Sequence, residues 1–114
     1  MSAKISIITI TFQAEAYIQR TLDSVHKQGH RDQFEYLIID GNSRDQTMSI
    51  IQNAPIKPDV LISENDQGIY DAMNKGLAKA TGEYVMFMNA GDQFVSDDTL
   101  KTILNHLSKN PDVL

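Results

Sequence analysis

An apolar run ends abruptly in an acid and turn-forming residues at Tyr36-Leu37-Ile38-Ile39-Asp40-Gly41-Asn42-Ser43. Three further apolar runs of the same kind are Ile5–Ile10, Val60–Ile62 and Tyr84–Met88. None of the four shows strict alternation of polar and apolar residues. This pattern is typical of strands that are buried on both faces of a parallel sheet.

Helical periodicity follows each apolar run. Gly29 and Gly82 are expected to end the first and third helices, and Ser43 with Gln46 predicts a capping box for the second. Ser96-Asp97-Asp98 predicts the start of the fourth, with acids at the positive end of its dipole. The order βαβαβαβα predicts an α/β fold with a mainly parallel sheet and helices on both faces. The apolar stripes of the four helices are Tyr17, Ile18, Leu22 and Val25; Met48, Ile50 and Ile51; Ile69, Ala72, Met73, Leu77 and Ala80; and Leu100, Ile103, Leu104 and Leu107.

The composition fits one ordinary domain, since the chain has 114 residues. Its apolar share of 41% and charged share of 22% exclude a disordered tail, a collagen-like repeat and a coiled coil. Because cysteine is absent, there is no disulfide framework, zinc-thiolate site or thiol nucleophile. The formal net charge of −5 argues against nucleic acid as the main partner, because a phosphate backbone favours a basic surface.

No apolar run approaches the roughly 18 residues that span a bilayer, and the first residues lack the pattern of a signal peptide. We therefore expect a cytoplasmic location, with any attachment to the cytoplasmic face of a membrane made by residues beyond Leu114. The last residues, Asn110-Pro111-Asp112-Val113-Leu114, read like the approach to another strand. We expect a single domain over residues 1–114 that is truncated before a further half.

Polar residues follow every predicted strand. In open parallel sheets, ligands bind at the carboxyl ends of the strands, where the strand order reverses. Three of the four strand ends carry an acid, so the sequence predicts a binding site at this edge. The segments are Thr11-Phe12-Gln13, Asp40-Gly41-Asn42-Ser43, Ser63-Glu64-Asn65-Asp66 and Asn89-Ala90-Gly91-Asp92.

Asp40 allows two interpretations. A carboxylate at a strand end can accept a hydrogen bond from a nucleobase N–H or a ribose hydroxyl, and we favour this role because helix capping does not require Asp40. In the alternative, the segment is only a turn: Gly41 supplies a positive φ, Ser43 caps the next helix and Asp45 is an acid in its first turn. We interpret Ser43 and Asp45 as structural.

The Asn89–Asp92 segment also allows two interpretations. Gly91 permits a tight turn, and Asp92 could hold a divalent cation against a diphosphate, since magnesium is typically bound by one or two carboxylates together with substrate phosphates. Alternatively, this is an ordinary turn, because asparagine, glycine and aspartate are common turn residues. The pattern alone leaves both open.

The remaining polar segments give weaker indications. Gly68 precedes the third helix, whose first amides could face an anion. Asn74 is expected to be half buried and to tie two loops together, whereas Lys75 is interpreted as an exposed lysine. Phe12 either stacks on a flat ring or covers the sheet edge.

Several classes of protein lose their main support. The sequence has no G-x-G-x-x-G, no Walker A loop and no G-x-S-x-G elbow, which argues against dinucleotide oxidoreductases, P-loop ATPases and serine hydrolases. His26, His30 and His106 share no metal-ligand spacing. A flavodoxin-like signalling domain shares the alternating pattern, but Thr11-Phe12-Gln13 stands where that fold groups several acids.

Taken in order, five segments resemble the nucleotide-sugar-binding half of a family 2 glycosyltransferase with the Rossmann-like GT-A fold. Each motif is loose, but the ordered set is specific. The similarity continues through Asp92. The segments are 6–12, 22–25, 38–47, 63–76 and 80–84.

The resemblance implies that these segments bind a nucleotide-diphosphate sugar in three parts. The first part surrounds the base and the ribose, with Asp40 bonding the base, typically uracil. The second lines the diphosphate. The third holds a metal ion, Mg²⁺ or Mn²⁺, through Asp92. The implied residues are, in the same order, Thr11, Phe12, Glu15 and Asp40; Asp66, Gly68 and the Met73-Asn74 turn; and Asn89, Gly91 and Asp92.

Three departures from the family pattern matter. The family often has asparagine where Gln13 stands, and many members have arginine where Met73 stands. Many members also have acids in place of Asn89 and Gly91, so the metal segment holds one carboxylate here. The donor diphosphate would have to supply the other metal ligands.

The activity that the resemblance implies is sugar transfer, with inversion, to a hydroxyl of a glycan or lipid-linked acceptor in polysaccharide or cell-surface glycan assembly. A divalent ion would stabilise the charge of the leaving nucleoside diphosphate. The catalytic base of such enzymes lies downstream of the metal segment, so we expect it beyond Leu114. The alternative is a nucleotide-binding or regulatory module without the chemistry. Exposed strand edges could also allow a homodimer.

Overall fold

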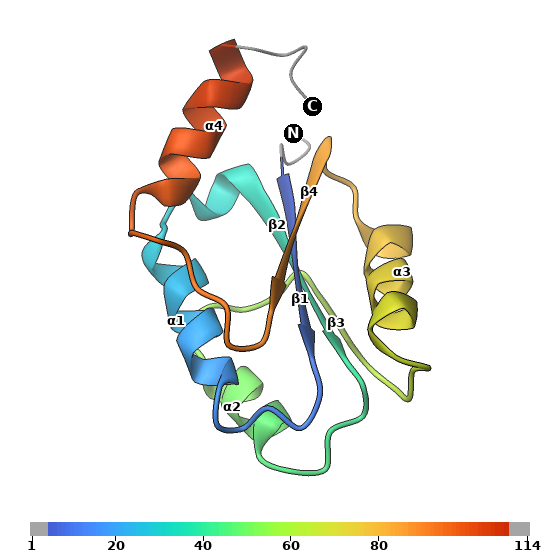
Figure 1. Cartoon of the computed structure of the whole chain (residues 1–114). Coiled ribbons are helices and arrows are strands. Elements are labelled where there is room, and N and C mark those ends of the chain that lie inside the picture. The colour runs from blue at the N-terminus through green and yellow to red at the C-terminus, as the bar shows by residue number, and fades with distance from the viewer. Residues whose placement is uncertain (1–4, 110–114) are drawn as a thin grey trace.

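The computed structural model describes residues 5–109, which form one βαβαβαβα unit (Figure 1). The predicted order is confirmed, and every strand continues one residue past its apolar run. The strands are β1 (Ile5–Thr11), β2 (Phe34–Asp40), β3 (Val60–Ser63) and β4 (Tyr84–Asn89). The helices are α1 (Ile18–Lys27), α2 (Thr47–Asn53), α3 (Ile69–Lys79) and α4 (Thr99–Lys109), with a short 3₁₀ turn, η1, at Arg31–Gln33.

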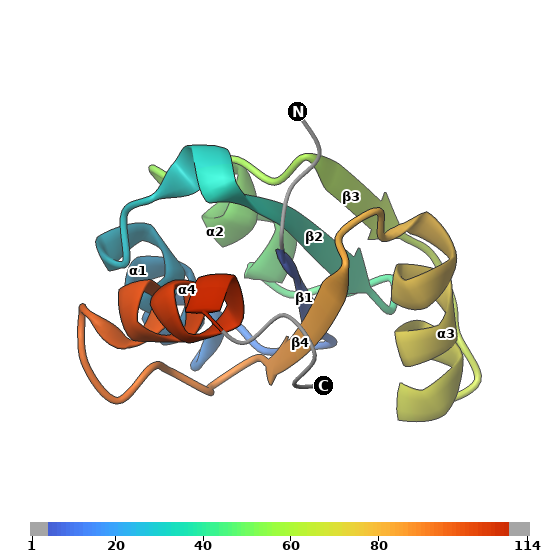
Figure 2. The same cartoon turned by 90° about the horizontal axis from the view of Figure 1, so that it is seen from above.

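The four strands form one parallel sheet in the order β3-β2-β1-β4. The chain steps outward from β1 to β3 and then returns to the other side of β1, so the strand order reverses between β1 and β4. Helices α1, α2 and α4 cover one face of the sheet, and α3 covers the other (Figures 1 and 2). The predicted fold class is therefore confirmed.

The sheet divides the core into two clusters. The larger cluster lies between the sheet and α1, α2 and α4, and the smaller one lies on the α3 side. Strands β1 and β2 are buried on both faces, as predicted, because they lie in the middle of the sheet. The same prediction is wrong for β3 and β4, which are edge strands: Leu61 and Val85 are each 39% exposed.

Helix α3 packs on the sheet through its smallest residues. Ala72 and Gly76 are buried, and a Cβ on Gly76 would lie 2.8 Å from Cγ2 of Ile8. The predicted apolar stripe of this helix is only partly buried. Ile69 and Leu77 are 48% and 47% exposed, because contact along Ala72 and Gly76 leaves them at the flanks.

The predicted helix ends are confirmed only in part. Helix α3 ends at Lys79 with Ala80 as its C-cap, so the predicted end at Gly82 is wrong. Helix α4 begins at Thr99, after Ser96-Asp97-Asp98, and has no acid in its first turn. Helix α1 ends before Gly29, which has a φ of 65°. Helix α2 begins at Thr47 without a side-chain cap, so the predicted capping box of Ser43 and Gln46 is wrong. Within residues 5–109, no helix has both the length and the apolar character that crossing a bilayer requires.

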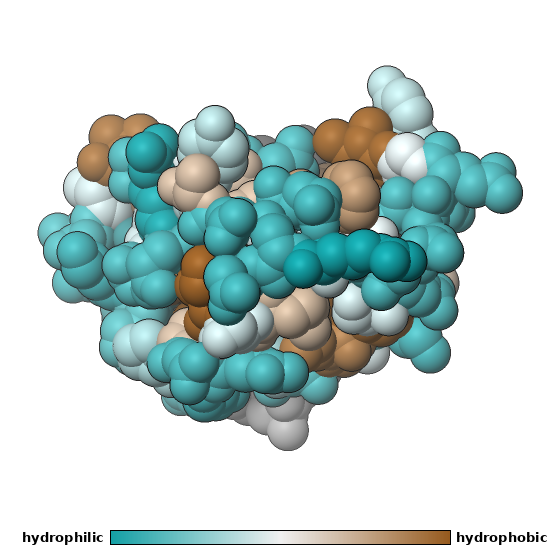
Figure 3. Space-filling model, turned by 90° about the horizontal axis from the view of Figure 1, so that it is seen from below, coloured by the Kyte–Doolittle hydropathy of each residue, from teal (hydrophilic) through white to brown (hydrophobic). Residues whose placement is uncertain are grey.

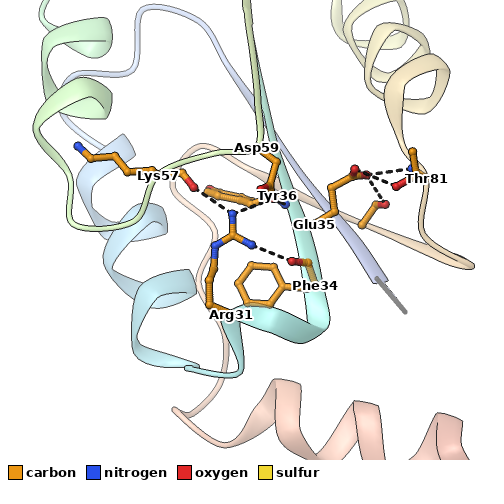
Figure 4. Close-up of polar contacts among 8 residues, drawn as sticks. Arg31, Phe34, Glu35, Tyr36, Lys57, Asp59 and Thr81 are labelled. Carbon is orange, nitrogen blue, oxygen red and sulfur yellow. Dashed lines mark hydrogen bonds and ion pairs between the residues drawn. The ribbon is translucent and has the colours of Figure 1, made fainter. Parts of the chain in front are cut away.

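Two polar clusters fasten the amino ends of the strands (Figure 4). Arg31 Nη2 donates to Asp59 Oδ2 at 2.8 Å, and the same oxygen accepts from Tyr36 N at 2.8 Å. Glu35 accepts from the amide and the hydroxyl of Thr81, both at 2.9 Å. These bonds join β2 to the segments that precede β3 and β4, at the edge away from the predicted site.

Candidate functional site

A cavity of about 370 Å³ opens at the carboxyl ends of β1 and β4, where the strand order reverses. Five predicted site residues line it: Thr11, Phe12, Asp66, Gly68 and Asn89. Figure 3 views the molecule from this edge and shows mostly hydrophilic side chains with hydrophobic groups between them. A cavity at this point of a parallel sheet is the expected place for a ligand.

Aromatic and apolar side chains are exposed around this cavity. Phe12 is 62% exposed, Tyr17 is 55% exposed and Ile69 is 48% exposed. Beside Phe12, Oγ1 of Thr11 is buried, and within the described part of the chain it has no hydrogen-bond partner. Buried polar atoms without a partner are rare, so a ligand in the cavity is a natural source of the missing bond.

Asp40 lies behind the cavity wall. Its side chain is fully buried, and Oδ1 accepts from Ser43 Oγ at 2.7 Å. Oδ2 accepts from Ser43 N and from Ser63 Oγ, both at 2.8 Å. Asp40 does not cap α2, as we argued, but the turn after β2 and Ser63 use its carboxylate, so it has a structural role that the capping argument did not consider. A contact between Asp40 and a base stays a prediction.

The loop after β1 is fastened to the loop after β2. Gln13 N donates to Ser43 Oγ at 2.8 Å, and Glu15 N donates to Asp45 Oδ2 at 3.2 Å. The hydroxyl of Thr47, which donates to Asp45 Oδ1, is the main cause that lowers the pKa of Asp45. Ser43 and Asp45 are thus structural, although they bridge loops. Glu15 is exposed and lies outside the cavity wall.

Gly41 packs against two residues of the first cavity wall, which leave little space for a side chain. The positive φ that we predicted for Gly41 belongs to Asn42, at 71°, so that prediction is wrong. A Cβ on Gly41 would lie 3.0 Å from Cδ1 of Phe12 and 3.1 Å from Oδ2 of Asp66. Because glycine has no side chain, Phe12 and Asp66 can keep their positions in the wall.

The turn after β4 has the tight form that the sequence predicts. Gly91 has a φ of 103°, and Asp92 N donates to Asn89 O at 2.8 Å. Asp92 is exposed, and its Oδ2 accepts from Asn89 N at 2.9 Å. It lies beside a second cavity of about 350 Å³ between β4 and α4. Asp40 ends β2 and Asp92 follows β4, so both lie at the carboxyl edge of the sheet, with β1 between these two strands.

Donor atoms for a cation are few at this turn. Asp92 is a single carboxylate, and in residues 5–109 no three histidine, aspartate or glutamate side chains gather where they could share a metal ion. Mg²⁺ and Mn²⁺ prefer oxygen ligands, and Mg²⁺ is commonly held by one or two carboxylates plus substrate phosphates. The residues therefore fit a metal site that a bound diphosphate completes.

The start of α3 reaches the first cavity through Gly68, which has a φ of 108° and donates from its amide to Asp66 Oδ1 at 3.2 Å. Asn74 is exposed and lies outside the cavity wall, so its predicted half burial is wrong. Lys75 ties the loop to the helix instead, because its Nζ donates to the carbonyl of Asn65 at 2.8 Å. Its side chain is only 20% exposed, so our interpretation of Lys75 as an exposed lysine is also wrong.

A row of buried polar side chains on α1 and at its C-cap was not predicted by the sequence analysis. Thr21, Ser24 and Gln28 recur at intervals of three and four residues and face the segment between β4 and α4. The hydroxyl of Thr21 accepts from Gly91 N at 2.8 Å and donates to Asp92 O at 2.7 Å. Thr21 therefore holds the backbone of the turn that contains the predicted metal ligand.

The other two members of the row hold the rest of this connection. Ser24 Oγ accepts from Phe94 N at 2.7 Å. Gln28 donates from Nε2 to Ser96 O and accepts at Oε1 from Leu100 N, both at 2.7 Å. Their helical spacing beside the apolar stripe of α1 can be read from the sequence. Their partners are backbone groups, which leave no pattern in a sequence.

Comparison with known proteins agrees with this geometry. The sequence profile described as Glycosyl transferase family 2 matches residues 6–114. The chain belongs to this family. A PGL/p-HBAD biosynthesis glycosyltransferase of Mycobacterium bovis is 40% identical over 101 residues, which cover 86% of this family 2 chain and 39% of that protein. The chain spans 39–40% of the length of the first curated relatives that it matches.

Solved structures confirm the Rossmann-like GT-A fold of this family 2 chain. Residues 1–349 of Staphylococcus aureus TarS, in complex with UDP-GlcNAc, match with a TM-score of 0.85 and 29% identity, over 95% of this chain and 32% of that one. A mannosyltransferase of Pyrobaculum calidifontis, in complex with GDP-Man and Mn²⁺, matches with a TM-score of 0.79 and 28% identity, over 92% of this chain and 32% of that one.

Proposed function

We propose that the cavity between β1 and β4 binds the nucleoside diphosphate of a sugar donor, and that the chain takes part in transferring the sugar to a hydroxyl of a glycan or lipid-linked acceptor. The observation that carries the proposal is the unpaired buried hydroxyl of Thr11 beside the exposed ring of Phe12, at the point where the strand order reverses. The UDP-GlcNAc and GDP-Man complexes of two structural relatives support this class of ligand.

Each part of the cavity has a task in this proposal. The ring of Phe12 stacks on the base, and Oγ1 of Thr11 forms a hydrogen bond with the nucleoside. The start of α3 at Gly68 presents backbone amides and the positive end of a helix dipole to the diphosphate. We favour uridine as the nucleoside because of the family resemblance.

Asp92 supplies the protein's carboxylate to a divalent cation in this proposal. When bound, Mg²⁺ or Mn²⁺ stabilises the charge that develops on the leaving diphosphate. Asp92 is exposed and lines the second cavity, and its carboxylate would meet phosphate oxygens from the solvent side. Inversion, a base beyond Leu114, a cytoplasmic location and a homodimer stay predictions.

A second candidate is a nucleotide-binding or regulatory module that keeps the fold without the chemistry. The observation in its favour is the single carboxylate of the turn after β4. In this case nucleotide binding would not depend on a metal ion.

Calorimetric titration with UDP and GDP, each with and without Mn²⁺, tests the proposal. We expect UDP binding that becomes tighter with Mn²⁺. Asp92→Asn should weaken UDP binding in the presence of Mn²⁺ by roughly tenfold or more, so that Mn²⁺ no longer tightens it. UDP binding without metal should stay unchanged. The matched control is Asp97→Asn, an exposed acid that lies in the wall of neither the first nor the second cavity.

The outcomes separate the candidates. Binding with tightening that Asp92→Asn removes supports the transferase donor site. Binding that ignores Mn²⁺ supports the regulatory module. A chain that binds neither nucleotide under either condition contradicts both.

A further inference from the structure

We propose that Thr21, a buried residue of α1, is a positioning residue for the metal-binding turn Asn89–Asp92. The proposal rests on the proposed function. Thr21 acts through the backbone of Gly91 and Asp92, and it lies in the wall of neither cavity at this edge.

The hydroxyl of Thr21 uses both of its hydrogen-bonding roles on one turn. It accepts from Gly91 N at 2.8 Å and donates to Asp92 O at 2.7 Å, so it binds one backbone group of each of these two residues. The distance of 3.5 Å from Thr21 Oγ1 to Asn89 O is too long for a further strong hydrogen bond. Thr21 is fully buried, so water does not compete for these bonds.

The turn is closed by its own hydrogen bond from Asp92 N to Asn89 O at 2.8 Å, which fixes its form but not its position in the molecule. Gly91, with a φ of 103°, lacks the Cβ that would narrow its backbone freedom. The carboxylate of Asp92 bonds to Asn89 N, which belongs to the same turn, so this bond moves with the turn. Two contacts fix the turn from outside: Ala90 N donates to Ile10 O of β1 at 2.9 Å, and Thr21 of α1, which runs beside this connection in Figure 1, holds Gly91 and Asp92.

A single carboxylate makes the position of this turn decisive. Asp92 is the one acid of the Asn89–Asp92 segment, and in residues 5–109 no group of three metal-binding side chains shares its task. Groups that orient a metal ligand typically change metal affinity by about 10- to 100-fold when they are removed. Thr21 is therefore expected to control the metal dependence of nucleotide binding.

Ser24 provides a matched control on the same helix. Its hydroxyl accepts from Phe94 N at 2.7 Å, two residues past Asp92. Ser24→Ala removes a buried bond between α1 and the same connection, as a Thr21 variant does. It should lower stability without moving Asp92.

The experiment compares UDP affinity with and without Mn²⁺ for the wild-type chain, Thr21→Val, Thr21→Ser and Ser24→Ala. Thermal midpoints and the Mn²⁺ electron paramagnetic resonance spectrum are recorded in parallel. Thr21→Val keeps the side-chain volume and should lose about 10- to 100-fold of the Mn²⁺-dependent tightening while keeping metal-free UDP affinity. Thr21→Ser should restore the tightening, and Ser24→Ala should lower only the midpoint.

The proposal is overturned if Thr21→Val keeps the full Mn²⁺-dependent tightening, or if Ser24→Ala loses it equally. If the valine variant does not fold, Thr21→Ala gives the same comparison, because it leaves space for water to satisfy the two backbone groups. A wild-type chain without tightening overturns the metal part of the proposed function, and the positioning role with it. Loss in Thr21→Val that Thr21→Ser and Ser24→Ala do not share supports both.

Discussion

At the scale of residues, hydrogen-bond partners decide what each carboxylate at the ligand edge can do. Asp40 is buried and accepts from three donors, whereas Asp92 is exposed and accepts from one amide. A buried donor that loses its acceptor costs about 1–3 kcal/mol, and an exposed one costs little because water replaces the bond. The two acids therefore differ in their contribution to folding.

Asp40→Asn should lower the free energy of unfolding by about 1–3 kcal/mol, because the amide would direct hydrogens at the donors of Ser43 and Ser63. Denaturant unfolding measures the change. Asp66→Asn is the control, since its remaining oxygen can still accept from Gly68 N. Equal losses for the two variants would contradict the role assigned to Asp40.

The sequence placed polar residues at the strand ends but did not reveal their partners. Thr11, Asp40 and Asp92 lie at the edge that the parallel sheet required. The bonds of Asp40 to Ser43 and Ser63 could not be predicted, because they depend on how three loops meet. Sequence patterns report burial along one element, whereas these bonds join separate elements.

At the scale of elements, small residues decide how closely α3 approaches the sheet. Apolar periodicity predicted this helix and its place after β3. The predicted stripe included Ala72, which is buried, but it missed Gly76, because an apolar pattern gives a glycine no weight. The periodicity also missed the exposure of β3 and β4, since an apolar run looks the same in an edge strand and a central one.

Gly76→Ala tests this packing. Alanine favours a helix over glycine by about 1 kcal/mol, but overpacking a core costs about 1–3 kcal/mol. The new Cβ would lie 2.8 Å from Cγ2 of Ile8, so we expect net destabilisation in urea unfolding. Leu77→Ala, on the half-exposed flank, should cost less than the typical 2–5 kcal/mol of a buried leucine. A more stable Gly76→Ala variant would contradict the close approach.

At the scale of the whole molecule, the two edges of the sheet have different tasks. The amino edge is fastened by Arg31, Asp59, Glu35 and their partners (Figure 4), and the cavity lies at the carboxyl edge. Desolvation raises the pKa of Asp59, but the Tyr36 amide and the Arg31 guanidinium outweigh it, so this pKa lies below its usual 3.8.

Asp59 should therefore give the fold a pH-dependent stability. Because the folded pKa is lower than the unfolded one, its contribution is complete above about pH 4 and is lost as the pH falls through the folded value. Asp59→Asn should cost at most about 1 kcal/mol at pH 7, since the pair is half exposed, and less at pH 2.5. Urea midpoints at both pH values measure this. A larger stability cost of Asp59→Asn at pH 2.5 than at pH 7 would contradict this role of Asp59. The control is Asp32→Asn, because Asp32 is an exposed acid.

The most direct test of the central claim is an amide NMR titration of the chain with UDP, followed by Mn²⁺. The account predicts that UDP shifts the amides of residues 11–14, 68–72 and 89–90, and that Mn²⁺ then broadens signals around Asp92. Amides at Arg31, Glu35 and Asp59 should stay unchanged. Shifts centred on those amino-edge residues, or no shifts at saturating UDP, would contradict the account.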